Sequence, residues 1–341
     1  MSSAIPEQFT GYAAMNQEKG KKLEVEPWKF TPKKWAEEDV DIKISCTSIC
    51  GSCVHTINDG KMAFAYFLPL RRRSRSYRYR PGSCTKCDLC LEGREQYCEK
   101  GMIGTYQGKW EDGSVAQGGY ADYIRVKGRF AIPIPEGISD EEAAPLCCAG
   151  VTVYSPMRRF HAGPGKKVGV VGIGGLGHLG LQISNALGAE TFALSHSDKK
   201  VPDAEKLGVD ADHFVVYKDI AATAKKWARK FDLIVCTANN NDLPIEALFF
   251  KLLRPEGTLV LCGLPEEKLP AMYGHALVGK GVSLAGSLIG GTKELDELFK
   301  LAVDHKIRPW IETRPMSEAT QTLQDMHAGH ARYRYVLTNS K

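Results

Sequence analysis

Four closely spaced cysteines carry the strongest chemical signal in the chain. They follow the pattern Cys84-x2-Cys87-x2-Cys90-x7-Cys98. Thiolates at this spacing suit a closed tetrahedral zinc site, and such a zinc would be structural because the protein fills all four positions. Two disulfides or free buried thiols are the alternatives. Polar neighbours such as Thr85 and Lys86 disfavour both of them.

A glycine-rich turn predicts a nucleotide-binding site. The segment Gly172-Ile-Gly-Gly-Leu-Gly177 follows an apolar strand-like run and opens a helix-like one, the context that a dinucleotide fingerprint requires. Gly172 would make the tight turn, Gly174 would let the backbone approach a pyrophosphate, and Gly177 would allow close helix–strand packing. A glycine-rich turn in an unrelated α/β domain is the alternative. The expected cofactor-binding residues are Gly172, Ile173, Gly174, Gly175, Leu176 and Gly177.

The residues after the second strand favour NADP(H) over NAD(H). An NAD site places Asp or Glu about 20 residues after the glycines, where it accepts hydrogen bonds from the ribose 2′-hydroxyl. Here the chain reads Ser195-His196-Ser197-Asp198-Lys199-Lys200. Hydroxyls and lysines suit a 2′-phosphate, which needs donors and positive charge. In the competing interpretation Asp198 reaches the ribose and the lysines are ordinary solvated residues.

A thiol, a hydroxyl and an imidazole occur close together in Cys50-Gly-Ser52-Cys53-Val-His55. By itself this spacing predicts only an ordinary loop. Two other cysteines, Cys236 and Cys262, lie in predicted core strands and are most simply small apolar side chains.

Six short apolar runs must position the nucleotide-binding residues. Helix-like stretches lie between these runs, which cover residues 168–172, 191–195, 213–217, 233–237, 258–263 and 282–287. This alternation predicts an α/β fold with a doubly wound parallel sheet and right-handed crossovers, in a nucleotide-binding domain at residues 151–289. Residues 1–150 contain short alternating runs punctuated by Pro and Gly, which predict a mostly β domain. Residues 290–341 predict two helices and a strand that return to this first domain.

Composition and charge exclude several classes of protein. The 341 residues suffice for two domains, and 43% hydrophobic residues exclude a disordered chain. One stretch supplies more positive charge than the chain's whole net charge of +5: it holds Lys61 and the arginines at 71, 72, 73, 75, 78 and 80. The other residues together are therefore slightly acidic. We therefore expect no nucleic-acid partner. Without an apolar leader or a long uncharged run, and with eleven cysteines in a chain of this length, we expect a cytoplasmic protein without membrane contact.

Together these motifs resemble the zinc-containing medium-chain alcohol dehydrogenases, and among them the NADP-dependent cinnamyl alcohol dehydrogenase group. The resemblance runs over nearly the whole chain. Besides the four cysteines and residues 172–180, it rests on Cys50-Gly-Ser-x-x-His55, Gly101-Met-Ile-x-Thr-Tyr106, Gln117-Gly-Gly-Tyr-Ala-Asp-Tyr123, Ala144-Pro-Leu-Cys-Cys-Ala-Gly-Val-Thr-Val-Tyr154, Ser287-Leu-Ile-Gly290 and Arg332-Tyr-Arg334.

The resemblance implies a GroES-like β domain that carries both zinc sites, a Rossmann domain and a homodimer. Cys50 and Cys148 match two ligands of a catalytic zinc, and Ser52 and His55 match a relay that passes the alcohol proton through the nicotinamide ribose to solvent. The implied reaction interconverts aromatic or aliphatic primary alcohols and aldehydes, with zinc polarising the oxygen and hydride moving to or from nicotinamide C4. Positions that match the cofactor lining are Ser52, Thr152, Ser195, His196, Ser197, Lys199, Lys200, Thr237, Gly263, Ser287, Leu288 and Ile289.

The chain departs from this family between residues 56 and 83. The family has Gly-His-Glu in this interval, and its His is the third ligand of the catalytic zinc. Here Asp59 is the interval's only His, Cys, Asp or Glu. We therefore expect an incomplete catalytic zinc site and missing barrel strands. Cys53, at a position where the family commonly has Asp, offers a substitute thiolate.

Three explanations for residues 61–80 remain open. The stretch is a mis-spliced or frame-shifted translation, a basic insertion that binds anions, or a solvated loop. A basic insertion would make the chain a catalytically impaired variant that keeps its structural zinc and its nucleotide binding.

Overall fold

The computed structural model describes residues 5–58, 75–77, 82–105, 108–265 and 268–339. The chain divides into two compact units. Unit 1 comprises residues 1–148, 291–303 and 308–341, and unit 2 comprises residues 149–290 and 304–307. Unit 1 is therefore assembled from segments that precede and follow unit 2 in the sequence. Most of residues 61–80 lie outside the described residues. Every prediction made for residues 59–74 and 78–81 lies outside them as well.

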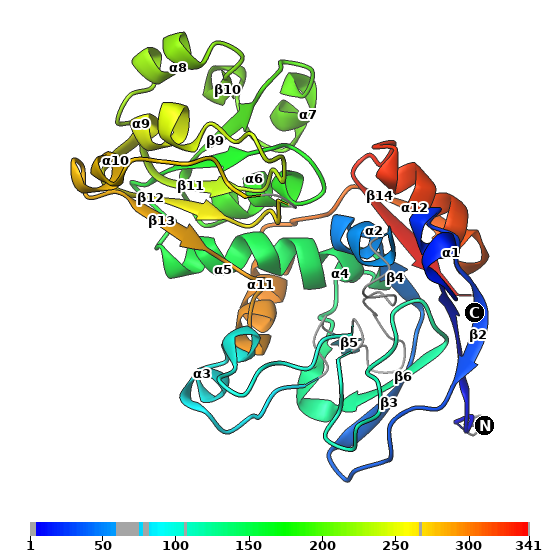
Figure 1. The fold of residues 1–341 in the computed structure, drawn as a ribbon. Helices are drawn as coiled ribbons and strands as arrows, with labels where there is room; N and C mark the ends of the chain where they lie inside the picture. The colour runs from blue at the N-terminus through cyan, green and yellow to red at the C-terminus, as the bar shows by residue number, and fades with distance from the viewer. Residues whose placement is uncertain (1–4, 59–74, 78–81, 106–107, 266–267, 340–341) are drawn as a thin grey trace. The chain divides into compact units, whose positions relative to one another are not determined.

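Unit 2 is built on a six-stranded parallel sheet (Figure 1). Its strands lie in the order β10-β9-β8-β11-β12-β13, which is the doubly wound order with its switch point between β8 and β11. The six predicted strands are confirmed, although β12 begins earlier than expected. The strands are β8 (Lys167–Val171), β9 (Glu190–Ser195), β10 (Phe214–Val216), β11 (Phe231–Cys236), β12 (Leu253–Leu261) and β13 (Ser283–Gly286).

The central strands of unit 2 are apolar along their whole length because both faces of the sheet are covered. Val168, Val170 and Val171 on β8 and Ile234 and Val235 on β11 are fully buried. Helices α5 and α6 pack against each other and against this sheet, while α8 and α9 pack with η5. The helices are α5 (Val151–Arg159), α6 (Gly177–Ala186), α7 (Val201–Lys206), η4 (Ala211–His213), α8 (Ile220–Lys226), η5 (Ile245–Phe249), α9 (Phe250–Leu252) and α10 (Gly274–Val278).

Unit 1 contains several small sheets around its own apolar core. β1 (Phe9–Ala13) pairs with β2 (Glu26–Phe30), β3 (Asp39–Lys43) with β6 (Tyr123–Lys127), and β5 (Arg75–Tyr77) with β7 (Ala131–Pro133), all antiparallel. Phe9, Ile42, Ile124 and Phe130 lie in the core between these strands. The unit also has short helices that the sequence did not predict, namely α1 (Gln17–Lys21), α2 (Gly51–Asn58), α3 (Asp88–Leu91), η1 (Glu95–Tyr97), η2 (Gly128–Phe130), α4 (Asp140–Pro145) and the π-helical turn η3 (Leu146–Gly150).

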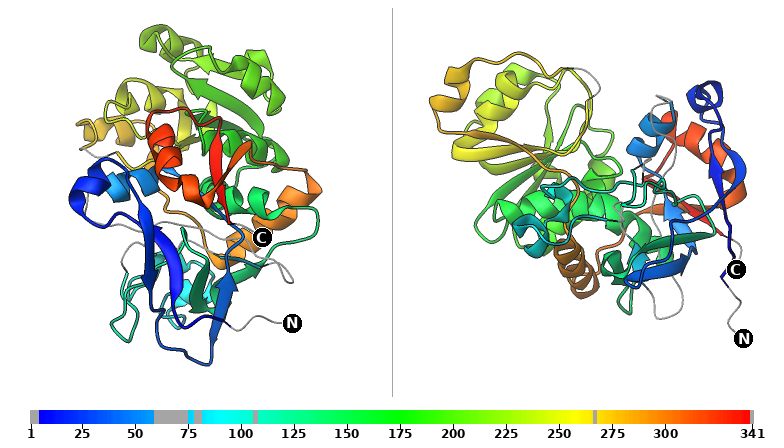
Figure 2. Two further views of the ribbon diagram at one scale, coloured as in Figure 1. Left: turned by 90° about the vertical axis from the view of Figure 1, so that its right-hand side faces the viewer. Right: turned by 60° about the horizontal axis from the view of Figure 1, so that its bottom comes forward.

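Most of the C-terminal segment belongs to unit 1. It forms α11 (Thr292–Asp304), β14 (Ile311–Pro315), η6 (Met316–Glu318), α12 (Ala319–His327) and β15 (Arg334–Thr338). β15 lies between β14 and β4 (Cys46–Ser48), antiparallel to β4. Thr320 on α12 exchanges hydrogen bonds with the backbone of Val25, and Figure 2 shows the orange-red α12 near the blue N-terminal elements. Strand β14 was not predicted.

No helix in the described ranges is long and apolar enough to cross a membrane.

Candidate functional site

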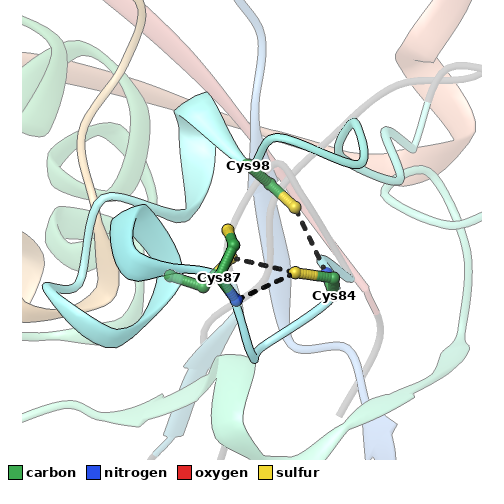
Figure 3. A group of neighbouring side chains, drawn as sticks. Cys84, Cys87 and Cys98 are labelled. Atoms are coloured by element: carbon green, nitrogen blue, oxygen red, sulfur yellow. Dashed lines mark hydrogen bonds between the residues drawn. The ribbon is translucent and has the colours of Figure 1, made fainter.

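The four predicted zinc ligands come together on the loop around α3. Figure 3 shows three of them, Cys84, Cys87 and Cys98. The sulfur atoms of Cys84, Cys87, Cys90 and Cys98 all lie within 4.8 Å of one another. Cys90 and Cys98 are buried, whereas Cys84 and Cys87 are half-buried. Four converging thiols fit a zinc ion with no open coordination position. The loop can therefore hold a structural zinc.

Backbone amides prepare this loop for a metal. The N–H groups of Lys86 and Cys87 lie 3.5 and 3.3 Å from the Cys84 sulfur. Their hydrogen bonds lower the pKa of the Cys84 thiol to about 6. Burial instead raises the pKa of Cys90 to about 12. Without metal, Cys84 thus ionises before Cys90, and metal binding must displace the proton of Cys90.

A buried carboxylate ties the zinc loop to the start of α11. Glu95 is 2% exposed and accepts hydrogen bonds from the Thr292 backbone N–H at 3.0 Å and hydroxyl at 2.6 Å. Arg129 pairs with Glu95 and donates to the Cys90 carbonyl at 2.7 Å. No local pattern in the chain indicates this contact, because Glu95 and Thr292 are 197 positions apart.

Three further thiols form a second cluster, which we call the α2 thiol cluster: Cys50, Cys53 and Cys148. The Cys50 and Cys53 sulfur atoms are 3.7 Å apart, and Cys148 is hydrogen-bonded to Cys50. Cys50 and Cys53 are almost fully buried, and Cys148 is half-buried. Cys148 lies in the π-helical turn η3, which begins directly after Pro145. Because proline has no backbone N–H, it interrupts the α-helical hydrogen bonds at this point. The two predicted catalytic-zinc ligands, Cys50 and Cys148, therefore do meet.

Two buried donors surround the α2 thiol cluster. Arg334 at the start of β15 is 1% exposed, and it hydrogen-bonds to Cys148. Tyr120 is 3% exposed, and its hydroxyl lies beside Cys53. Hydrogen bonds from Cys148 and Cys53, with a smaller contribution from Arg334, hold the pKa of Cys50 well below its ordinary value. In the described part of the chain, the Arg334 Nε and Nη2 atoms and the Tyr120 hydroxyl have no aligned hydrogen-bond partner.

The predicted relay residues, Ser52 and His55, lie on helix α2. The spacing had predicted an ordinary loop here, so that expectation was wrong. Both side chains are half-buried, and positions three apart on a helix lie on the same face. Ser52 and His55 therefore lie on one side of α2.

The glycine fingerprint forms a tight turn after β8. Gly172 has φ +86°, and the Thr237 hydroxyl donates at 2.8 Å to the carbonyls of Val171 and Gly172. A Cβ on Gly177 would lie 1.9 Å from the Gly172 carbonyl oxygen, whereas a Cβ on Gly174 would meet nothing within 4 Å. Gly177 is thus required for packing, while Gly174 leaves open space at the N-terminus of α6, where a pyrophosphate fits.

The other predicted cofactor residues of unit 2 follow the carboxyl ends of its strands, except Thr152, which lies on α5. Ser195 ends β9 and accepts from the Ser197 N–H at 3.4 Å, while His196 and Lys199 are exposed. Lys200 is 3.7 Å from Asp203 on α7. The Thr152 carbonyl accepts a hydrogen bond from the Cys262 thiol at 3.8 Å. Gly263 packs against the Ala238 backbone, and the Ser287 N–H donates to the Leu261 carbonyl at 3.0 Å. Leu288 and Ile289 follow β13.

Comparison with known proteins assigns the family. Residues 76–136 match the family model "Alcohol dehydrogenase GroES-like domain", and residues 175–304 match "Zinc-binding dehydrogenase". NADP-dependent alcohol dehydrogenase 6 of Saccharomyces cerevisiae is 37% identical over 98% of this chain and 97% of its own length. Cinnamyl alcohol dehydrogenase 3 of Arabidopsis thaliana is 34% identical over 96% and 90% of the two chains.

Solved structures agree with the sequence comparison. A cinnamyl alcohol dehydrogenase from Sorghum bicolor superposes with a TM-score of 0.86 at 28% identity, over 97% of both chains. The enzyme from Helicobacter pylori, solved with NADP(H), gives a TM-score of 0.84 at 27% identity over 98% of this chain and 99% of its own. This protein belongs to the zinc-containing medium-chain alcohol dehydrogenases, within the cinnamyl alcohol dehydrogenase group.

Proposed function

We propose that this chain interconverts primary alcohols and aldehydes of the cinnamyl type, aromatic or aliphatic, by NADP(H)-dependent hydride transfer. The observation that carries the proposal is the Gly174 cradle at the switch point of the sheet, in a chain whose relatives are named NADP-dependent alcohol dehydrogenases. Family membership supports zinc as the second cofactor. The alternative of an impaired anion-binding variant gains no support from these comparisons.

We propose the following roles for the residues of unit 1. Cys50 and Cys148 hold the catalytic zinc, and Cys84, Cys87, Cys90 and Cys98 hold the structural zinc. When bound, the catalytic zinc supplies a Lewis acid at the alcohol oxygen and the nicotinamide supplies or accepts the hydride. Ser52 would receive the alcohol proton, and His55 would help to pass it on to solvent.

For unit 2 we propose NADP(H) as the preferred cofactor. Gly172, Ile173, Gly174, Gly175, Leu176 and Gly177 form the pyrophosphate turn. Ser195, His196, Ser197, Lys199 and Lys200 bind the 2′-phosphate, which the exposure of Lys199 supports. Thr152, Thr237, Gly263, Ser287, Leu288 and Ile289 line the cofactor. The functional domains are then residues 1–150 for catalysis and zinc, 151–289 for NADP(H), and 290–341 as the return to the catalytic domain.

The proposed activity is tested by following cinnamaldehyde-dependent NADPH oxidation. His55→Ala is expected to lower the rate about 100-fold, the contribution of a positioned acid–base group. His327→Ala, at an exposed position on α12, is the matched control and should leave the rate unchanged. A native protein that binds NADPH but turns over neither aromatic nor aliphatic aldehydes would refute the proposed activity.

We further propose a homodimer that forms through the β13 edge of the sheet. β13 pairs with β12 alone among the described strands. The segment that precedes it exposes Leu264, Tyr273 and Val278, the last by 81%. Soluble proteins usually cover an apolar sheet edge of this kind. Analytical ultracentrifugation should therefore show a dimer that Val278→Glu converts to a monomer, while Val115→Glu, at an exposed position in unit 1, leaves the dimer intact.

We also propose that the protein works in the cytoplasm, which the free state of all eleven cysteines supports.

A further inference from the structure

Two buried donors beside the α2 thiol cluster, Arg334 and Tyr120, keep hydrogen-bonding capacity that the thiols leave unused. Arg334 has two buried nitrogens, Nε and Nη2, without a partner in the described residues, and the Tyr120 hydroxyl is likewise without an aligned one. Buried polar groups are almost always hydrogen-bonded, and buried charges are almost always paired. Donors that converge without acceptors indicate that the cluster is built to carry negative charge.

The spacing of the thiols fits a metal with sulfur ligands. Zinc–sulfur bonds of about 2.3 Å place tetrahedral thiolate ligands about 3.8 Å apart. The Cys50 and Cys53 sulfur atoms are already 3.7 Å apart, and Cys148 is hydrogen-bonded to Cys50. The three sulfur atoms do not all lie within 4.8 Å of one another. Metal binding therefore requires at least one of the three thiols to move closer to the other two.

We propose that Cys53 is the third protein ligand of the catalytic zinc, with Cys50 and Cys148, and that Arg334 neutralises the resulting site. This inference rests on the proposed function and names the ligand that the missing Gly-His-Glu segment would otherwise supply. Three thiolates around a divalent ion leave one negative charge, and the buried guanidinium supplies one positive charge. The fourth coordination position stays open for the alcohol or aldehyde oxygen.

The first test counts metal in the full-length protein. Zinc is measured by mass spectrometry after gel filtration. The native chain is expected to hold two zinc ions and Cys53→Ser only one, because a serine hydroxyl is a poor zinc ligand. Two control variants should keep both ions: Cys46→Ser, which removes a buried thiol outside the cluster, and Asp59→Asn, which removes the other candidate ligand in residues 56–83.

The second test counts thiolates and does not depend on a variant that folds. Chelation should empty the open site before the closed one, and Co²⁺ then reports each thiolate through its sulfur-to-metal charge-transfer absorption. In the native protein we expect the refilled site to absorb three-quarters as strongly as the four-thiolate site does when that site is also loaded with Co²⁺. A two-thiolate site would absorb only half as strongly.

Each result decides the proposal. One zinc in the native chain, two zinc ions in Cys53→Ser, a half-intensity cobalt band, or loss of zinc in Asp59→Asn overturns it. NADPH titration of every variant separates this inference from the proposed function. A native enzyme that binds NADPH and reduces aldehydes while Cys53→Ser keeps both metals leaves the function standing and removes Cys53 as a ligand.

Discussion

Two glycines of the nucleotide turn should respond in opposite ways to the same substitution. A Cβ on Gly177 would lie 1.9 Å from the Gly172 carbonyl oxygen and 2.9 Å from its carbonyl carbon. Because both atoms are backbone, the turn or α6 must shift. Overpacking of this kind costs about 3 kcal/mol. For a domain of this size that corresponds to a melting temperature lower by about 6–12 °C.

Gly174→Ala should leave stability intact and weaken nucleotide binding. Nothing lies within 4 Å of a Cβ at Gly174, and its φ is outside the left-handed range, so alanine fits without strain. Because alanine restricts the unfolded chain, it should raise the free energy of unfolding by about 0.4–1 kcal/mol. The new methyl group nevertheless occupies the space that the pyrophosphate needs. We expect a loss of NADPH affinity of at least about tenfold, or about 1.4 kcal/mol.

Thermal melts and NADPH fluorescence titrations measure the two effects separately. Gly274→Ala on α10 is the matched control, since a Cβ there also meets open space, and it should change neither quantity. If Gly177→Ala melts like the native protein, or if Gly174→Ala binds NADPH with native affinity, the assignment of the two glycines to packing and to the cofactor is wrong.

Three further predictions follow from the described contacts. Lys199→Ala should lower the affinity for NADPH about fivefold and leave the affinity for NADH unchanged. The loss of NADPH affinity should be smaller at high salt, because the lysine is exposed. Equal effects on both nucleotides would contradict a 2′-phosphate role. Glu95→Gln should destabilise the protein by about 1–3 kcal/mol, because Thr292 and Arg129 lose a buried carboxylate; Glu92→Gln, at an exposed ion pair with Arg94, should be nearly neutral in the same melts. In the zinc-free protein, alkylation of Cys84 should rise with a midpoint near pH 6 while Cys90 stays unreactive at neutral pH, as mass spectrometry of pulse-labelled peptides would show. Because folding lowers the pKa of Cys84 from 9.0 to about 6, the stability contributed by its thiolate is complete above pH 9 and is lost as the pH falls through 6.

Local spacing predicted the parts of the site whose residues are neighbours in the chain. The four zinc-loop cysteines and the glycine turn each lie within one short segment, so their residue types reveal their chemistry. Strand periodicity likewise predicted the six-stranded sheet. These features depend on little that is distant in sequence.

Contacts between distant segments could not be read in the same way. Helix α2 was missed because glycine, serine and cysteine at its start are poor helix formers. It is held instead by α1 and α12, and a Cβ on Gly20 of α1 would lie 2.5 Å from the Ile57 carbonyl oxygen of α2. The burial of Arg334 and the bond between Glu95 and Thr292 also required the fold. A charged residue at a strand end carries no local sign of its partners.

The position of β15 in the chain affects how the protein is made. β15 completes the sheet with β4 and supplies Arg334 to the α2 thiol cluster, yet it follows the whole of unit 2 in the sequence. Unit 2 consists almost entirely of one uninterrupted stretch, so it can fold on the ribosome while unit 1 still waits for its last strand. During that interval Cys50, Cys53 and Cys148 have no guanidinium beside them. In the newly made chain, the α2 thiol cluster therefore meets metal or oxidant before Arg334 has joined it.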